Sequence, residues 1–205
     1  MPRSAGTIRL NGAQVPRLTV PDALAGGIAF VHQELNLFSN LDVAANVYIG
    51  REPRKFGWLQ LVDTDKLRET VQPYLDRLGA TFSPTTPVSR LSLANQQLVE
   101  IAKALSFNSR LLILDEPTSS LPVAETDRLL EVVAGLKAHG ISVIFISHRL
   151  QEVVDACDRV LVLRDGRLVG ELEGGAITHD AMVKLMVGRD LKVAYSAPAN
   201  ARGEI

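Results

Sequence analysis

The sequence has very little cysteine: Cys157 is the only one in 205 residues, so no disulfide can form within the chain. A single thiol fits a reducing compartment, and its ordinary role is that of a small apolar residue near a helix end. No run approaches the roughly 18 to 20 apolar residues of a spanning helix, and the start, MPRSAGTIRL, lacks a signal peptide's apolar segment. We therefore expect a soluble chain that reaches a membrane only through partners.

Positive and negative charges are nearly balanced, because the chain has 22 lysines and arginines and 23 aspartates and glutamates. The net charge of -1 and the pI of about 6.4 exclude a global basic field, so we expect no nucleic-acid partner, although local basic patches are not excluded. The length and the hydrophobic share of 46% suit one ordinary globular domain, or a large part of one.

The sequence also lacks any Gly-Lys pair, because all six lysines follow other residues. A nucleotide-binding loop of the pattern G-x-x-x-x-G-K-[ST] needs glycines to expose backbone N–H groups and a lysine for the β- and γ-phosphates. No such phosphate-holding loop is therefore present in these 205 residues.

What the sequence does contain is an alternation of apolar patterns that indicates an α/β fold. The apolar runs at 111–115 and 142–147 flank a helix at about 122–138, an order typical of parallel strands covered by helices on both faces. The other expected strands are 7–12, 27–33 and 159–172, the last a hairpin turned at Asp165 and Gly166. The other expected helices are 42–49, 64–78, 94–106, 149–156 and 178–187.

Three stretches depart from regular structure. Pro73 falls inside the helix at 64–78, where proline removes a hydrogen bond and typically costs about 3 kcal/mol, so we expect a kink or break there. Residues 50–60 are rich in glycine, proline and positive charge and are interpreted as an exposed loop. Residues 192–205 resemble the start of a linker.

Residues 111–121, LLILDEPTSSL, deliver two carboxylates at the end of an apolar strand. Asp115 is placed to hold Mg²⁺, and Glu116 to polarise an attacking water. The alternative is a buried strand that simply meets an acidic turn.

His148 follows the next strand, and parallel strands end at the same edge of a sheet, so we expect its imidazole beside the carboxylates. There it could contact a γ-phosphate or orient the water.

Two further features carry polar groups toward the same chemistry. Gln33 ends the apolar run IAFVHQ and offers an amide that can ligate a metal or a water. The segment LSLANQQ, residues 91–97, opens a helix that Ser92 can cap, and its backbone N–H groups and dipole suit a phosphate. The alternative is a capped helix without a ligand, but the position of the segment between Gln33 and the Asp-Glu strand favours phosphate recognition.

Taken in order, Gln33, LSLANQQLVEIAKAL, LLILDEPTSSL and ISHRL closely resemble the ATP-binding cassette (ABC) of ABC transporters. The resemblance covers about residues 5–191. The stretches VHQELNLFSNLDVAANVYIGREP and LMVGRDL are most similar to the first of two fused cassettes in monosaccharide importer ATPases of the ribose, galactose and xylose type. The resemblance implies a P-loop-NTPase-like α/β cassette, partial over 1–191, with a helical subdomain at roughly 42–106.

The resemblance also implies a function, a membrane location and partners. It implies an ATPase that uses ATP and Mg²⁺ to drive carbohydrate uptake, peripheral to the cytoplasmic face of the plasma membrane. Its partners would be transmembrane permease subunits, a second ABC cassette and, indirectly, a periplasmic or extracellular sugar-binding protein. The sugar itself cannot be read here, because specificity in such systems resides in the binding and membrane proteins.

The roles of the strand-end residues follow from the same resemblance. Asp115 would hold Mg²⁺, Glu116 would act as the catalytic base and His148 would contact the γ-phosphate. Gln33 would sense Mg²⁺ as a metal ligand, while the loop after it touches the transmembrane subunit.

The signature segment carries two departures from the family pattern. Ser92, Ala94 and Gln97 would belong to the signature, which contacts ATP bound to the opposing cassette. Ala94 stands where the general signature has glycine, which crowds the approach of the backbone to phosphate. Pro122 replaces the usual aspartate after Leu121, which argues against ordinary signalling between cassettes there.

The missing phosphate loop has consequences of its own. The resemblance begins just after the place where that loop would end, so we expect an N-terminally truncated cassette that exposes apolar sheet edges and binds Mg-ATP weakly or not at all. A non-catalytic module that offers Ser92 to an intact cassette, and a non-functional remnant, are open alternatives. A soluble ABC ATPase of DNA repair or translation is disfavoured by the near-neutral charge and the absence of coiled-coil heptads.

Overall fold

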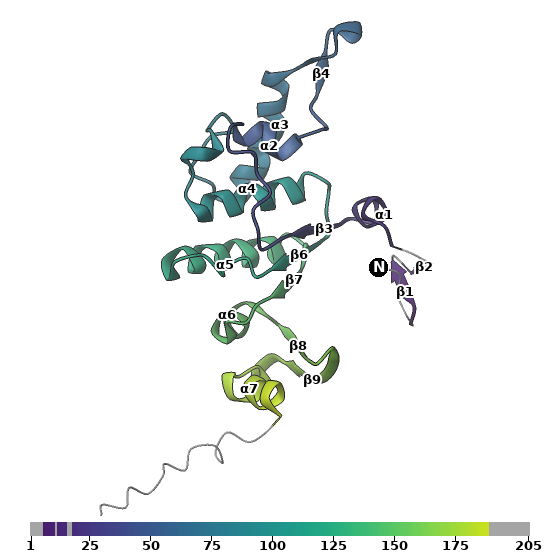
Figure 1. The fold of residues 1–205 in the computed structure, drawn as a ribbon, viewed down its shortest axis with the longest axis vertical. Coiled ribbons are helices and arrows are strands. Elements are labelled where there is room, and N and C mark those ends of the chain that lie inside the picture. The colour runs from purple at the N-terminus through teal and green to yellow at the C-terminus, as the bar shows by residue number, and fades with distance from the viewer. Residues whose placement is uncertain (1–5, 11, 16–17, 189–205) are drawn as a thin grey trace, which may run out of the picture. The chain divides into compact units, whose positions relative to one another are not determined.

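We describe the chain from a computed structural model in which residues 6–10, 12–15 and 18–188 are described. The chain divides into two compact units, residues 1–148 and 149–205, and Figure 1 follows the elements of each. The linker expected at 192–205 lies outside the described residues. Within the described part, no helix is both long and apolar enough to cross a membrane.

A three-stranded parallel sheet organises the first unit, in the order β3-β6-β7. Its strands are β3 (Ile28–Val31), β6 (Leu111–Asp115) and β7 (Ser142–Ile146). Helix α5 (Val123–Ala138) connects β6 to β7, so the predicted order of strand, crossover helix and strand is confirmed. As described, β3 and β7 are the two edges of this sheet.

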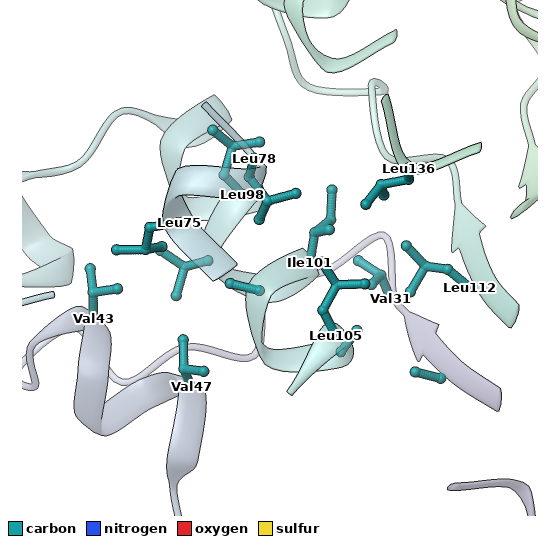
Figure 2. Close-up of a cluster of buried hydrophobic side chains, with 14 of the residues drawn as sticks. Val31, Val43, Val47, Leu75, Leu78, Leu98, Ile101, Leu105, Leu112 and Leu136 are labelled. Atoms are coloured by element: carbon teal, nitrogen blue, oxygen red, sulfur yellow. The ribbon is translucent and has the colours of Figure 1, made fainter. Parts of the chain in front are cut away.

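Helices cover one face of the sheet. Helix α4 (Leu93–Leu105) contacts β3, α5 contacts β7, and the two helices contact each other. Helices α2 (Val43–Tyr48) and α3 (Thr64–Arg77) pack on α4 and on each other, within the range predicted for a helical subdomain. Figure 2 shows the shared core, in which Leu98, Ile101 and Leu105 of α4 lie among side chains from the neighbouring helices and from the sheet.

Within the first unit, the described helices cover only that one face of the sheet, so the prediction of strands covered on both faces is not met by this unit alone. Leu112 and Leu114 of β6 are fully buried against the helices. Phe30, Ile144 and Ile146 lie on the opposite face and are 44 to 47% exposed. Their apolar character predicted burial, but no described helix of the first unit packs on that side.

Helix α3 runs through Pro73 without the break that the sequence predicted. Proline leaves the carbonyl four residues earlier without its helical partner, and that residue is Glu69. Both Pro73 and Glu69 lie on the exposed face of the helix, where water can hydrate the carbonyl. Meanwhile Leu67 and Val71 keep the buried face continuous.

Two small antiparallel hairpins and several short elements complete the first unit. The strand predicted at 7–12 is β1, but its partner β2 was not predicted. The predicted loop at 50–60 is largely exposed and contains part of a short hairpin. The elements are β1 (Ile8–Leu10), β2 (Ala13–Val15), α1 (Val20–Ala25), β4 (Arg54–Lys55), η1 (Gly57–Leu59), β5 (Leu61–Val62) and η2 (Val88–Arg90).

The second unit builds a small core of its own from Val153, Ile177 and Met182. Cys157, at the end of its first helix, is half-buried against this core, as expected for a structural thiol. The predicted hairpin is confirmed, with Asp165 and Gly166 at positive φ in its turn. Its elements are α6 (Leu150–Ala156), β8 (Arg159–Arg164), β9 (Arg167–Glu173), η3 (Gly174–Ala176) and α7 (His179–Val187).

Candidate functional site

Polar side chains follow the carboxyl ends of all three strands of the parallel sheet. Gln33 comes two residues after β3, Asp115 ends β6 with Glu116 directly after it, and His148 follows β7. The parallel register pairs Asp115 with Ile146, so these segments leave the sheet at the same edge. In open α/β sheets this edge is where ligands bind. The prediction that His148 lies beside the carboxylates is therefore confirmed.

A side-chain contact at this edge joins His148 to Glu116. The Nδ1 atom of His148 lies 3.2 Å from Oε1 of Glu116, and the side chains are 63% and 30% exposed. The backbone N–H of Glu116 donates to the carbonyl of Ile146, which ties the loop after β6 to the end of β7. Glu116 has a φ of 46°, a conformation that is uncommon outside glycine and is often found at functional sites.

This contact constrains the proton on the imidazole. An ionised carboxylate only accepts hydrogen bonds, so the nitrogen that faces Glu116 must carry the hydrogen if a bond forms. In a neutral His148, Nε2 is then left without a proton and can only accept a hydrogen bond. The pair can therefore accept a proton from a water molecule at Glu116, and can bind an anion through His148 only if the ring is protonated or turned.

A cavity of about 400 Å³ lies beside this edge, lined by Gln33, Gln97, Pro117 and residues 119–121 among others. Gln97 is 4% exposed, and its Nε2 atom has no hydrogen-bond partner among the described residues. A buried donor without a partner is rare in native proteins. The cavity is thus lined by side chains from two different segments, the buried Gln97 of α4 and the exposed Gln33 that follows β3.

The start of α4 is a capped helix, as the sequence predicted. The Oγ atom of Ser92 accepts from the backbone N–H of Asn95 at 3.4 Å. Ser92 is exposed and Ala94 half-buried, whereas Gln97 is buried one turn further on. The structure therefore brings Gln97 to the cavity with Gln33, while Ser92 and Ala94 stay at the surface end of the helix.

The donor atoms at the strand ends fit a metal ion that arrives with a nucleotide. Among the described residues, no group of three His, Cys, Asp or Glu side chains is placed to hold a metal alone. The carboxylate of Asp115 and the amide oxygen of Gln33 are hard oxygen donors, and Mg²⁺ usually takes only one or two such protein ligands and the rest from water and phosphates. These residues therefore suit Mg²⁺ in the presence of a phosphate ligand.

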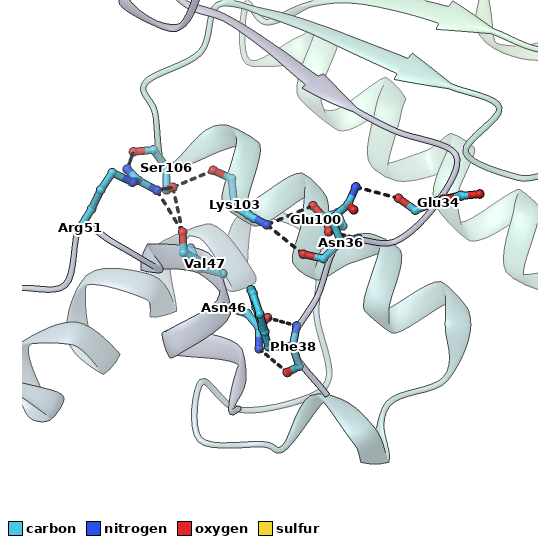
Figure 3. Close-up of polar contacts among 9 residues, drawn as sticks. All are labelled: Glu34, Asn36, Phe38, Asn46, Val47, Arg51, Glu100, Lys103 and Ser106. Carbon is cyan, nitrogen blue, oxygen red and sulfur yellow. Dashed lines mark hydrogen bonds and ion pairs between the residues drawn. The ribbon is translucent and has the colours of Figure 1, made fainter. Parts of the chain in front are cut away.

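Glu100 and Lys103 of α4 hold the loop after Gln33 in place. Neither residue was predicted from the sequence to do so. Figure 3 shows that Oε1 of Glu100 accepts from the backbone N–H of Asn36 at 2.8 Å, while Nζ of Lys103 donates to the Asn36 carbonyl at 3.2 Å. Lys103 also lies 3.8 Å from Glu100. A glutamate on the apolar face of α4 was the available signal, since buried carboxylates are rarely unpaired.

Asn46 fixes the same loop from α2. Its Oδ1 accepts from the N–H of Phe38 at 2.7 Å, and its Nδ2 donates to the carbonyls of Phe38 and Asp42. The side chain is completely buried. The loop that follows Gln33 is thus tied to two helices of the helical region (Figure 3).

A stacked arginine ties the end of α2 to the end of α4. The guanidinium of Arg51 lies 3.7 Å from the centre of the Phe107 ring and 4.8 Å from that of Tyr48, and donates to Oγ of Ser106 at 2.7 Å. Such stacking suits the planar, weakly hydrated guanidinium. Burial, together with hydrogen bonding to Tyr74, raises the pKa of Tyr48 to about 12.

Comparison with known proteins places the chain in a family. Residues 1–119, more than half of the chain, match the ABC transporter family. The chain therefore belongs to the ABC transporter family. The chain is also similar to two solved structures. One is a nucleotide-free ATP-binding cassette from an ABC transporter, with a TM-score of 0.75 at 22% identity over 95% of this chain and 77% of that one. The other is cbiO1 from Clostridium perfringens, with a TM-score of 0.67 at 25% identity over 82% of this chain and 66% of that one.

Similar curated proteins are named for sugar import. The ribose import ATP-binding protein RbsA of Rhodopirellula baltica is 45% identical over 192 residues, which are 94% of this chain and 37% of the relative. The galactose/methyl galactoside import ATP-binding protein MglA 1 of Photobacterium profundum is 40% identical over 203 residues, 99% of this chain and 41% of the relative. The chain thus spans about two fifths of the length of these relatives.

Proposed function

We propose that this chain forms the hydrolytic side of an ATP site in the ATP-binding subunit of a sugar importer. The observation that carries the proposal is the contact between His148 and Glu116, at the sheet edge that also bears Asp115 and Gln33. Membership of the ABC transporter family and similarity to ribose and galactose import ATP-binding proteins support it.

The proposed chemistry is hydrolysis of ATP: water attacks the γ-phosphorus, the bond from that phosphorus to the bridging oxygen breaks, and ADP leaves with the freed oxygen. Glu116 accepts the proton of the attacking water, and its fixed backbone holds the carboxylate at the strand end. His148 orients that carboxylate through Nδ1 and turns or gains a proton to contact the γ-phosphate. Asp115 and Gln33 would hold Mg²⁺, which would neutralise phosphate charge when bound.

The signature residues have separate proposed roles. Ser92 and Ala94, at the surface end of α4, face ATP held by a second cassette, fused or separate, and the positive end of the helix attracts its phosphates. Gln97 lines the cavity with Gln33. Through this contact region, binding or loss of ATP at the second cassette changes the position of the loop after Gln33. That loop in turn contacts transmembrane permease subunits at the cytoplasmic face of the plasma membrane.

Nucleotide affinity provides the first test. No Gly-Lys pair occurs in the sequence, so these 205 residues by themselves supply no loop of this pattern to hold the β- and γ-phosphates. In a titration with a fluorescent ATP analogue and Mg²⁺, we expect no saturable binding in the micromolar range. Placing a segment of strand, G-x-x-x-x-G-K-[ST] loop and helix ahead of residue 1 is expected to restore micromolar binding. Micromolar binding by the unmodified chain, or a folded hybrid that gains none, contradicts the proposal.

A second candidate function is a non-catalytic module that presents Ser92 to an intact cassette. The exposed, capped start of α4 favours it. The test is size-exclusion chromatography of the chain mixed with an intact ribose import ATP-binding protein. A complex that forms only with ATP and is lost in Ser92→Arg supports this module, whereas no complex under any nucleotide condition rejects it.

A further inference from the structure

An exposed apolar surface lies on the short hairpin at residues 54–62, formed by β4, η1 and β5. Trp58 at its tip is 88% exposed, and Phe56 is also largely exposed. Leu59 and Leu61 extend this surface along the hairpin. Figure 1 shows the β4 end of the first unit reaching beyond α3, on the side of the helices away from β6 and β7. We call residues 54–62, with their exposed side chains, the 54–62 hairpin.

The hairpin has a defined backbone that holds these side chains outward. Its two strands pair Arg54 with Val62 and Lys55 with Leu61. The side-chain amide of Gln60 donates to the carbonyl of Gly57 across the tip. The exposure of Trp58 is therefore a property of a folded turn, not of an irregular tail.

Positive charge stands beside the apolar tip. Arg54 and Lys55 are the only charged residues between positions 53 and 62. Arg54 donates to the carbonyl of Gln60, while Nζ of Lys55 lies 3.5 Å from Asp63 at the base of the hairpin. Glu52 is the other acid at the base. Aromatic and aliphatic side chains therefore occupy the tip, and the two cations lie on β4 nearer the base, where Lys55 is paired with Asp63.

This combination fits the interface of an anionic membrane. Tryptophan has an apolar body and a polar N–H and concentrates at the level of lipid headgroups, while lysine and arginine are attracted to anionic lipids. A convex tip, unlike a groove, offers no pocket for a peptide, but it can enter a fluid interface. We propose that the 54–62 hairpin inserts Trp58 and Phe56 into the interface of an anionic phospholipid membrane, with Arg54 and Lys55 beside the headgroups. This proposal stands independently of the proposed ATP chemistry.

Trp58 is the only tryptophan in the chain, so its fluorescence reports on the hairpin alone. The chain is mixed with vesicles of phosphatidylcholine, with or without phosphatidylglycerol. With anionic vesicles we expect a blue shift of the emission, protection from acrylamide and quenching by brominated lipids. These changes should weaken as salt is raised, because screening reduces the attraction between lysine or arginine and lipid. Neutral vesicles should produce much smaller changes.

Variants test whether vesicle binding depends on the 54–62 hairpin or on other exposed apolar residues. Arg54→Gln and Lys55→Gln should each weaken vesicle binding about fivefold, and Phe56→Ser should weaken it further while keeping Trp58 as the reporter. Val123→Ser is the matched control, because Val123 is an exposed apolar residue at the start of α5. It should bind vesicles like the unmodified chain. Circular dichroism confirms that each variant is folded.

Three results would overturn the proposal. The first is an unchanged Trp58 emission with anionic vesicles. The second is vesicle binding that Phe56→Ser and the two cation variants leave intact while Val123→Ser reduces it. The third is binding only to vesicles that contain the transmembrane subunits of a sugar importer, which would assign the hairpin to a protein partner instead of lipid.

Discussion

The imidazole Nδ1 of His148 lies 3.2 Å from the carboxylate Oε1 of Glu116, although the two residues follow different strands of the sheet. The contact exists because β6 and β7 are parallel neighbours and end at the same edge. It turns two separately placed polar residues into one unit that can hold and transfer a proton.

This contact predicts the tautomer of His148. When the ring is neutral, Nδ1 should carry the hydrogen, because Glu116 can only accept. In Glu116→Gln the amide can donate as well as accept, so the preference for the Nδ1–H form should weaken. Nitrogen-15 NMR of the imidazole distinguishes the two tautomers. The other three histidines serve as internal references, and a ring protonated mainly on Nε2 in the unmodified chain would contradict the assignment.

The loop after Gln33 should depend strongly on Asn46. Asn46→Ala removes the side-chain partner of both backbone groups of Phe38 and one of the two partners of the Asp42 carbonyl, and we expect a loss of about 2 to 4 kcal/mol in the free energy of unfolding. Asn40→Ala, at an exposed turn of the same loop, is the control and should change it by less than about 0.5 kcal/mol. Urea denaturation measures both. Equal losses in the two variants would show that the buried amide is not what fixes the loop.

The phenol of Tyr48 should lose its proton at a higher pH than an ordinary tyrosine does. Its pKa of about 12 lies above the usual value near 10. The folded chain therefore holds this proton more tightly than the unfolded chain. The resulting stabilisation is complete below about pH 10 and is lost as the pH rises through about 12.

Phenolate absorbance tests this titration. The unmodified chain minus Tyr48→Phe isolates one of the three tyrosines. The difference curve should have its midpoint near the raised value, with circular dichroism showing that the chain is still folded. A midpoint near that of free tyrosine would mean that Tyr48 is not buried against Tyr74 and Arg51.

Much of the fold could be predicted because local signals agree with it. Asp42 and Ser92 cap the helices that they were expected to start, and the turn at Asp165 and Gly166 forms as its composition indicates. The misses concern burial. The apolar strands suggested a sheet covered on both sides, and Pro73 suggested a broken helix, because sequence shows neither which face a neighbour covers nor where a carbonyl meets water.

The site was predictable to the extent that strand ends define it. Asp115, Glu116 and His148 could be placed together because parallel strands end at one edge, whereas Gln33 was expected to ligate a metal or a water without a derived position. Glu100, Lys103 and Asn46 were missed because their partners are backbone groups of a loop whose path no local pattern specifies. The burial of Gln97 beside Gln33 was missed for the same reason, since helical spacing alone does not say which residues of the first turns face a neighbouring loop.

The most direct test of the account is ATP hydrolysis by the hybrid that carries an added phosphate-loop segment, measured for Glu116 and for Glu116→Gln. We expect both proteins to bind Mg-ATP equally, and the Gln variant to hydrolyse it about a hundredfold to ten-thousandfold more slowly, the usual cost of losing a general base. Glu131→Gln, on the exposed face of α5, is the control and should leave the rate unchanged. Equal rates with and without the Glu116 carboxylate would show that this edge of the sheet is not the hydrolytic side of the site.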